Sequence, residues 1–273
     1  MSTAISESIV SPDWMTAHPA IAARLPITPL TTHCSKCHLR DLCLPCGMTG
    51  RDVERLDSLM FGRRRVAAGQ TLYREGERFQ SIYAVRNGTF KSSLTLADGR
   101  EQVSGFYMVG ELLGLDGVAN GAHASSTTAM EDAEVCSIPY TRFTEMAAGN
   151  SGMQHVVSRL MSREIVREHS LMVLLGSMNA EERLAAFLLN LSQRLKVRGY
   201  SATEFHLRMT RAEIGSYLGL TLETVSRAFG RLSRCGLIRF DDIGRRNIAV
   251  PSAEALVEFI RGTVSPPEPR TLQ

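Results

Sequence analysis

The sequence predicts an α+β fold with three parts: an N-terminal β jelly roll, one long helix and a C-terminal winged helix-turn-helix. Short strand-like runs separated by Gly-rich turns occupy residues 66 to 140, as is typical of a jelly roll. Helical spacing of apolar residues begins at residue 151 and continues for more than twenty positions. Two further helical patterns meet at Gly219, and a hairpin-like segment follows them.

The N-terminal fifty residues divide into an arm and a cysteine-rich segment. Residues 1 to 30 contain four prolines without a sustained hydrophobic period, so we expect a flexible arm. In residues 31 to 50, four of the chain's six cysteines lie within thirteen positions. The N-terminus lacks the basic and apolar regions of a secretory signal, which indicates a cytoplasmic protein with reduced thiols. There, clustered cysteines bind metal more often than they form disulfides.

Two sets of cysteines are candidates for holding a metal. Cys34, Cys37, Cys43 and Cys46 form a self-sufficient Cys-x2-Cys-x5-Cys-x2-Cys motif, and four thiolates suit a tetrahedral zinc site. Cys136 is a distant alternative to Cys46 as the fourth ligand. Spacing alone does not choose between these two cysteines.

Residues 51 to 150 are expected to form the jelly roll. Asn87-Gly88 and Asp98-Gly99 each separate two strand-like runs, which predicts two hairpins. The strand between the two turns alternates with a period of two and places three apolar residues on one face, namely Phe90, Leu94 and Leu96.

Residues 151 to 176 are expected to form a dimerisation helix. Its stripe has spacings of three and four, close to a coiled-coil heptad, and comprises Val157, Met161, Ile165, Glu168, Met172 and Leu175. Glu168 would bring two like charges together across the seam, which opposes pairing and keeps the dimer marginal. The alternatives are a helix packed on its own domain, and a Glu168 side chain that reaches water at the edge of the seam.

Residues 177 to 251 are expected to form the winged helix-turn-helix, before a C-terminal helix and tail over 252 to 273. Thr210 and Glu213 form a capping box for the first helix of the motif, and Thr221 can cap the second. Gly219 suits the tight turn between them. The second helix should bury one side, made of Leu222, Val225, Phe229 and Leu232.

The opposite side of that second helix carries side chains suited to base edges and phosphates, namely Glu223, Thr224, Ser226, Arg227 and Arg231. Arg245 and Arg246 follow in the predicted wing.

Residues 180 to 273 carry 14 Lys and Arg against 10 Asp and Glu, a net of +4, whereas residues 1 to 179 carry 17 against 18, a net of −1. This concentration of basic charge indicates a polyanion partner, although a solvated basic face is the simpler alternative.

Two classes of protein do not fit the sequence. The longest apolar runs, such as residues 171 to 175, are far too short to cross a bilayer, so we expect no membrane partner. The sequence contains no flavin or dinucleotide motif and no catalytic constellation, so we do not expect an enzyme.

Taken together, these segments resemble the CRP/FNR superfamily of bacterial transcription regulators, and within it the oxygen-responsive fumarate and nitrate reduction (FNR) branch. The similarity runs from about residue 31 to residue 251. It is carried by the first three cysteines and by four segments, "GELLGLD" (110–116), "EVCSIPY" (134–140), "NAEERLAAFLLNLS" (179–192) and "LGLTLETVSR" (218–227).

The resemblance implies a cyclic-nucleotide-binding-like jelly roll that acts as a sensor domain. Cys34, Cys37 and Cys43 match the family's three N-terminal cluster ligands, and Cys136 matches its distant fourth, so together they would hold a [4Fe–4S] cluster. Cys46 is an extra thiol where the family usually has none. In the family, the cluster-loaded dimer binds a palindrome of TTGAT-like half-sites, and oxygen converts the cluster and dissociates the dimer.

The same resemblance assigns roles on the DNA side. Glu223, Ser226 and Arg227 match the base-reading triplet, in which Arg227 would read the G of TTGAT and Glu223 the C opposite that G. Gly99 matches a glycine that such regulators present to RNA polymerase. The segment 119 to 130 lacks the arginine that usually holds a cyclic phosphate, so no cyclic nucleotide is expected. A zinc-stapled, constitutive DNA-binding regulator without redox sensing is the alternative function.

Overall fold

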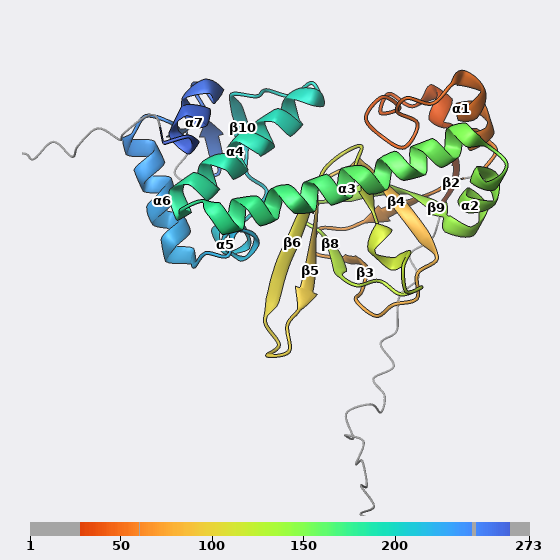
Figure 1. Ribbon diagram of the computed structural model, residues 1–273, viewed down its shortest axis with the longest axis horizontal. Coiled ribbons are helices and arrows are strands. Elements are labelled where there is room, and N and C mark those ends of the chain that lie inside the picture. Colours follow the sequence, from red (N-terminus) through yellow and green to blue (C-terminus); the bar gives the residue numbers. More distant parts are fainter. Residues whose placement is uncertain (1–27, 60, 242–243, 263–273) are drawn as a thin grey trace, which may run out of the picture.

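The computed structural model describes residues 28–59, 61–241 and 244–262. Most of the arm expected over 1 to 30, and the end of the expected C-terminal tail, lie outside these residues. Among the described residues, no helix is both long and apolar enough to span a bilayer. The elements run from the cysteine segment through two sheets and a long helix to a C-terminal domain (Figure 1).

Two antiparallel sheets form the N-terminal domain, as the sequence predicts. The first has the order β1-β2-β9-β4-β7 and the second the order β3-β8-β5-β6. Apolar side chains between them, including Val85, Phe90 and Val135, are buried. The strands are β1 (Thr28–Thr32), β2 (Phe61–Val66), β3 (Thr71–Tyr73), β4 (Ser81–Asn87), β5 (Phe90–Thr95), β6 (Glu101–Tyr107), β7 (Leu112–Leu113), β8 (Ser126–Ala129) and β9 (Ala133–Pro139).

Only one of the two predicted hairpins exists. β5 and β6 pair antiparallel around Asp98-Gly99. β4 and β5 lie in different sheets, so Asn87-Gly88 turns the chain from one sheet to the other. Gly88 has a φ of +84°, and a Cβ atom there would lie 2.6 Å from the Cβ of Ala133. A turn at Asn87-Gly88 was therefore predicted correctly, but the two strands that it connects do not pair with each other, because each pairs with strands far away in the sequence.

The predicted face of β5 is not continuous. Phe90 is fully buried, whereas Leu94 is 37% and Leu96 39% exposed. β8 pairs with β5 from Phe90 only as far as Ser93. Leu94 and Leu96 lie beyond that point, on the part of the β5–β6 hairpin that β8 does not flank, so their side chains leave the core face.

Three helices adjoin the first sheet: α1 (Gly50–Asp57), α2 (Tyr140–Ala148) and the long helix α3 (Ser151–Ser177). Their buried side chains form a second core with β4 and β9, in which Leu56, Phe143 and Met153 are fully covered. Asn150 caps α3 by accepting bonds from the amides of Gly152 and Met153. Figure 1 shows α3 running along the molecule from the cysteine segment to the C-terminal domain.

The C-terminal domain has the predicted order of helix, helix-turn-helix and wing. It comprises α4 (Ala180–Val197), β10 (Glu204–His206), α5 (Arg211–Leu218), α6 (Leu222–Arg234), β11 (Arg239–Phe240), β12 (Asn247–Ala249) and α7 (Ala253–Ile260). The capping box of Thr210 and Glu213 and the cap by Thr221 are present. Gly219 adopts a φ of +64° in the left-handed region, as the tight turn requires.

The buried side of α6 differs from the prediction at one position. Val225, Phe229 and Leu232 are buried, but Leu222 is 49% exposed. Leu222 is the first residue of the helix, and at this position its side chain lies beyond the edge of the core. The core itself continues into the jelly roll, because Val103 and Phe106 of β6 pack with α4 and α5 residues.

Candidate functional site

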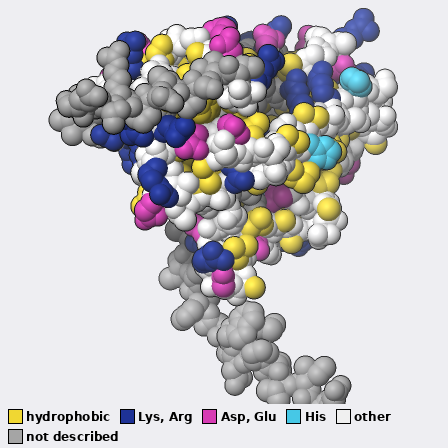
Figure 2. All heavy atoms as spheres, turned by 60° about the vertical axis from the view of Figure 1, so that its left-hand side comes forward, with side chains coloured by type: hydrophobic (Ala, Val, Ile, Leu, Met, Phe, Trp, Pro, Cys, Tyr) yellow, Lys and Arg dark blue, Asp and Glu magenta, His cyan; other side chains and the backbone are white. Residues whose placement is uncertain are grey.

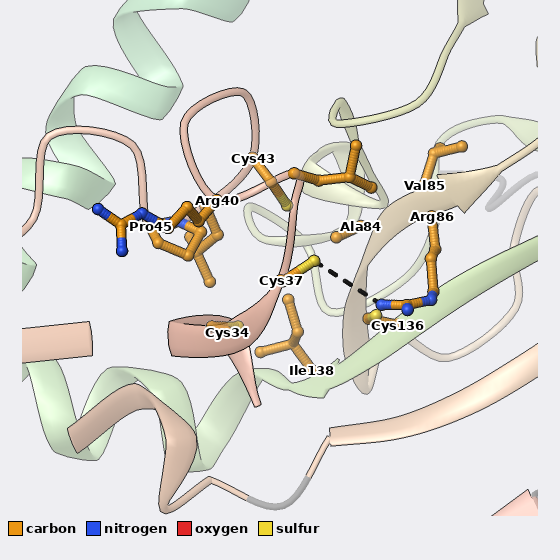
Figure 3. Close-up of a pocket in the computed structure, with 12 residues that line it drawn as sticks. Cys34, Cys37, Arg40, Cys43, Pro45, Ala84, Val85, Arg86, Cys136 and Ile138 are labelled. Carbon is orange, nitrogen blue, oxygen red and sulfur yellow. Dashed lines mark hydrogen bonds between the residues drawn. The ribbon is translucent and has the colours of Figure 1, made fainter. Parts of the chain in front are cut away.

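Four thiols from two distant parts of the chain line one hollow. Cys34, Cys37 and Cys43 come from the cysteine loop, defined here as residues 33 to 49, and Cys136 comes from β9. Figure 3 shows the loop thiols directed toward the strand that carries Cys136. The structure therefore brings together all four cysteines that the resemblance implied as ligands.

The cysteine loop is held in place by its apolar residues and by two polar anchors. Leu39 and Leu44, which lie between the cysteines, are buried. The amide of Ser35 donates a hydrogen bond to Asp57 at the end of α1 over 3.2 Å. Arg159 of α3 donates to the backbone carbonyl of Cys46. The loop is thus fixed to α1 at one end and to the long helix at the other.

The surroundings of three of the thiols make the free thiolates unfavourable. Burial, followed by the neighbouring thiols, raises the pKa of Cys34 and raises that of Cys43 to about 12. Burial also raises the pKa of Cys136, although Arg86 opposes the shift. These three thiols therefore keep their protons unless a positively charged group enters the hollow, as a metal centre would.

Arg86 is a functional residue that the sequence analysis missed. Its Nη1 atom lies 3.7 Å from Sγ of Cys37, and its Nε atom lies 3.3 Å from the carboxylate of Glu134 (Figure 3). Arg86 follows Ile82 and Ala84 with a period of two, and both of those residues are buried. A charged residue that continues a buried apolar alternation was the available signal for an inward-facing cation.

Cys46 is absent from the residues that line this hollow. It lines a neighbouring one, together with Leu42, Gly110, Glu111 and Arg163. Within the described residues, no three His, Cys, Asp or Glu side chains converge as a ready site for a single metal ion.

The predicted DNA-facing side of α6 lies at the surface. Four of its predicted residues are exposed, namely Glu223, Ser226, Arg227 and Arg231, while Thr224 is partly buried. Arg227 donates to the hydroxyl of Thr224 over 3.3 Å. Figure 2 turns the C-terminal domain toward the viewer and shows Lys and Arg side chains on that face.

The wing residues Arg245 and Arg246 are exposed as well. Arg211, at the start of α5, was not among the predicted residues. Its guanidinium lies 3.8 Å from the ring centre of Phe229 on α6 and donates to the carbonyl of Arg245 over 3.3 Å. Arg211 therefore ties the wing to the core of the helix-turn-helix. Arg245 has a φ of +51°, an uncommon backbone conformation for a residue other than glycine.

The long helix α3 is divided into a covered half and an open half. Val157 packs against the core of its own domain, and Met161 is half-buried. Further along, Ile165 and Met172 are 55% and 60% exposed, and Glu168 is exposed beside Arg167, whose guanidinium lies 3.7 Å away. A second row, Val166 and Val173, is equally exposed and was missed because the stripe was read as a single row.

The side chain of Asp116 is hydrogen-bonded to residues 124 and 125. The carboxylate of Asp116 accepts hydrogen bonds from the amides of Ala124 and Ser125, each over 3.0 Å, and from the Ser125 hydroxyl over 2.9 Å. Gly99 lies in the turn between β5 and β6, exposed, with a φ of +82°.

Two family models match the chain. A cyclic nucleotide-binding domain matches residues 63–150, and a Crp-like helix-turn-helix domain matches residues 182–259. The transcriptional regulatory protein btr of Bordetella pertussis is 47% identical over 86% of this chain and 97% of its own length. The fumarate and nitrate reduction regulatory protein of Escherichia coli is 38% identical over 83% of this chain and 90% of its own length.

A solved structure agrees with these relatives. FixK2 from Bradyrhizobium japonicum is 30% identical, with a TM-score of 0.67 over 73% of this chain and 97% of its own. Proteins of this kind are transcription regulators and not enzymes, and their helix-turn-helix domains indicate DNA binding and dimer formation. The chain therefore belongs to the CRP/FNR family of DNA-binding transcription regulators.

Proposed function

We propose that this regulator senses oxygen through a [4Fe–4S] cluster held by Cys34, Cys37, Cys43 and Cys136. The carrying observation is that these four thiols line one hollow, whereas Cys46 lines another. A cluster of this type is held by four cysteine thiolates, which is the number of cysteines that line the hollow. The names of the fumarate and nitrate reduction relatives support the same assignment.

The residues around the hollow have separate tasks in this proposal. When bound, the cluster supplies a redox centre that oxygen can reach and oxidise. The four thiols would give up their protons on binding iron, whose positive charge opposes the burial that raises the pKa of Cys34, Cys43 and Cys136. Arg86 places a positive charge beside Cys37, which offsets part of the negative charge of the four ligands.

The DNA side of the proposal rests on α6 and on the wing. We infer that the dimer binds a TTGAT-type palindrome, with Arg227 reading the G and Glu223 its paired C, helped by Ser226 and Thr224. Three further arginines would hold backbone phosphates, namely Arg231, Arg245 and Arg246. Their exposure on one domain surface supports this role.

The remaining partners follow from the open surfaces. The exposed half of α3, with Ile165, Glu168 and Met172, would meet its counterpart in a second copy, while Val157 and Met161 continue that row. Gly99 in the β5–β6 turn would be presented to RNA polymerase. Such a regulator works in the cytoplasm, where DNA is present and thiols stay reduced.

Anaerobic purification of the full chain tests the proposal. Iron, sulfide and zinc contents are measured together with the visible absorption spectrum, and binding to the palindrome is titrated before and after exposure to air. We expect about four irons per chain, by the composition of the cluster, and DNA binding that weakens in air. Zinc without iron, with DNA binding indifferent to air, would instead establish the zinc-stapled constitutive regulator.

A further inference from the structure

The turn between β6 and β7 contains the "GELLG" segment, and its Glu111 binds two arginines of the C-terminal domain. Arg194 of α4 donates to Glu111 through Nε and Nη2 over 3.0 and 2.6 Å. Arg198, which follows α4, donates to the same carboxylate over 2.5 Å. The amide of Met108 completes the set over 3.0 Å. A single carboxylate thus accepts four hydrogen bonds, three of them from charged donors of the other domain.

The two arginines also bind the backbone on either side of Glu111. Arg194 donates to the carbonyl of Phe106 over 2.7 Å, and Arg198 donates to that of Val109 over 2.7 Å. Another ion pair between the domains, Glu131 with Arg208, consists of a single contact at 3.2 Å, and the Arg208 side chain is half exposed. Directional contacts from two planar guanidiniums fix an orientation far better than one exposed pair does.

The other side of the same turn touches the cysteine loop. Gly110 has a φ of +86°, and a Cβ atom on it would lie 2.9 Å from the Cβ of Leu42. Leu42 directly precedes Cys43, one of the proposed cluster ligands. Leu42, Cys43, Gly110, Glu111 and Arg198 also line one common hollow. The backbone of the turn is therefore packed against the ligand loop while its side chain holds α4.

We propose that the Gly110–Glu111 turn links the cysteine loop to the orientation of the DNA-binding domain, with Glu111 as the positioning residue. The inference rests on the proposed function, since it concerns how the state of the cysteine loop reaches α6. A change in the path of Leu42 and Cys43 displaces the turn that packs on them. Glu111 moves with this turn. It retains its hydrogen bonds to Arg194 and Arg198 only if α4 moves too, and the helix-turn-helix moves together with α4.

The experiment compares Glu111→Gln with Glu131→Gln, a control that removes the same charge from an interdomain pair away from the cysteine loop. The first readout is a ratio of two affinities for the palindrome, that of the cluster-loaded protein divided by that of the cluster-free protein. Energetic coupling between sites is typically about 5- to 150-fold, so Glu111→Gln should lower this ratio at least about fivefold at unchanged iron content. Glu131→Gln should keep the wild-type ratio. Arg194→Lys, which lies outside the hollow that Cys43 lines, should act like Glu111→Gln.

Amide hydrogen exchange on cluster-free protein is the second readout, and it does not depend on the cluster. Glu111→Gln should speed exchange both at residues 194 to 198 and at Leu42 and Cys43, and Glu131→Gln should not. A wild-type affinity ratio of one would contradict the proposed function, and the exchange result would still decide the link. Unchanged exchange in the cysteine loop, or wild-type ratios in both Glu111→Gln and Arg194→Lys, would overturn the link.

Discussion

The cysteine site and the DNA-facing helix are built in opposite ways. Glu223, Ser226 and Arg227 lie within five positions of one helix, and their exposure follows from its caps and its buried side. The cysteine site combines a loop with Cys136, which follows Cys43 by more than ninety positions. Cys136 is opposite Ala84 on β4 and opposite Arg63 on β2, so its place depends on the register of three strands. A local site survives changes elsewhere, whereas a composite site depends on the whole domain.

The largest expected effect tests whether the composite site includes the distant strand. Cys136→Ser should abolish cluster assembly and the DNA binding that depends on it, because a hydroxyl is a poor replacement for a thiolate ligand. Cys34→Ser, Cys37→Ser and Cys43→Ser should do the same, and Cys46→Ser, the matched control, should retain the cluster. Iron content and the visible spectrum of anaerobically purified protein give the result. Loss of the cluster in Cys46→Ser with retention in Cys136→Ser would reverse the ligand assignment.

The same contrast explains what the sequence could reveal. The helix-turn-helix was predictable because the capping box of α5, the Thr221 cap, Gly219 and the buried spacing of α6 are all local signals. Cysteine spacing alone left Cys46 and Cys136 equally eligible, since nothing local records that β9 passes beside the loop. The family resemblance supplied Cys136, and the structure places it with the other three. The inward direction of Arg86 could have been predicted from the alternation of its strand, but its partner Cys37 could not, because that cysteine lies on a loop more than forty positions away.

A second, smaller effect separates base reading from phosphate contact on the DNA side. Arg227→Ala should weaken binding to the TTGAT palindrome by about 10- to 100-fold, since a good bidentate contact carries about 1–3 kcal/mol of discrimination. It should also flatten the preference at that G·C pair. Arg245→Ala should weaken binding to all sequences alike and reduce the salt dependence. Titrations against single-base variants at two salt concentrations measure both. Equal losses for every sequence in Arg227→Ala would make Arg227 a phosphate contact.

The open half of α3 provides a third test, with an effect of several-fold. Glu168→Ala removes a like charge that two copies would bring together, so cluster-free protein should associate more strongly. Arg167 already lies 3.7 Å from Glu168 in the same chain, which limits the gain. Glu145→Ala removes another exposed carboxylate, one that lies on α2 rather than on α3, and serves as the control. Sedimentation equilibrium measures the association, and an unchanged monomer fraction would place Glu168 in water at the edge of the interface.

Where the fold departs from the prediction, non-local pairing is the cause. The turn at Asn87-Gly88 has the residues of a hairpin, yet β4 finds its partners in β7 and β9. The face expected from Phe90 to Leu96 is buried only where β8 flanks β5, and that pairing ends at Ser93. Neither event has a signal within the strand itself. The two helices of the helix-turn-helix, whose hydrogen bonds are internal, begin directly after the predicted caps Thr210 and Thr221, and the first ends at Gly219.

The smallest expected effect is a pH dependence of stability, and it concerns the contact of Glu111 with Arg194 and Arg198, which joins the two regions. Burial alone would raise the pKa of Glu111, but Arg194 and Arg198 outweigh it and hold the pKa below its ordinary value of 4.5. The unfolded chain therefore binds this proton more readily than the folded chain does. The stability that Glu111 contributes is complete above pH 4.5 and is lost as the pH falls through the lower, folded pKa. Cluster-free wild type and Glu111→Gln should thus differ by a few degrees in unfolding midpoint at neutral pH, and this difference should shrink in acid. A difference that stays constant with pH would assign the contribution to packing rather than to charge.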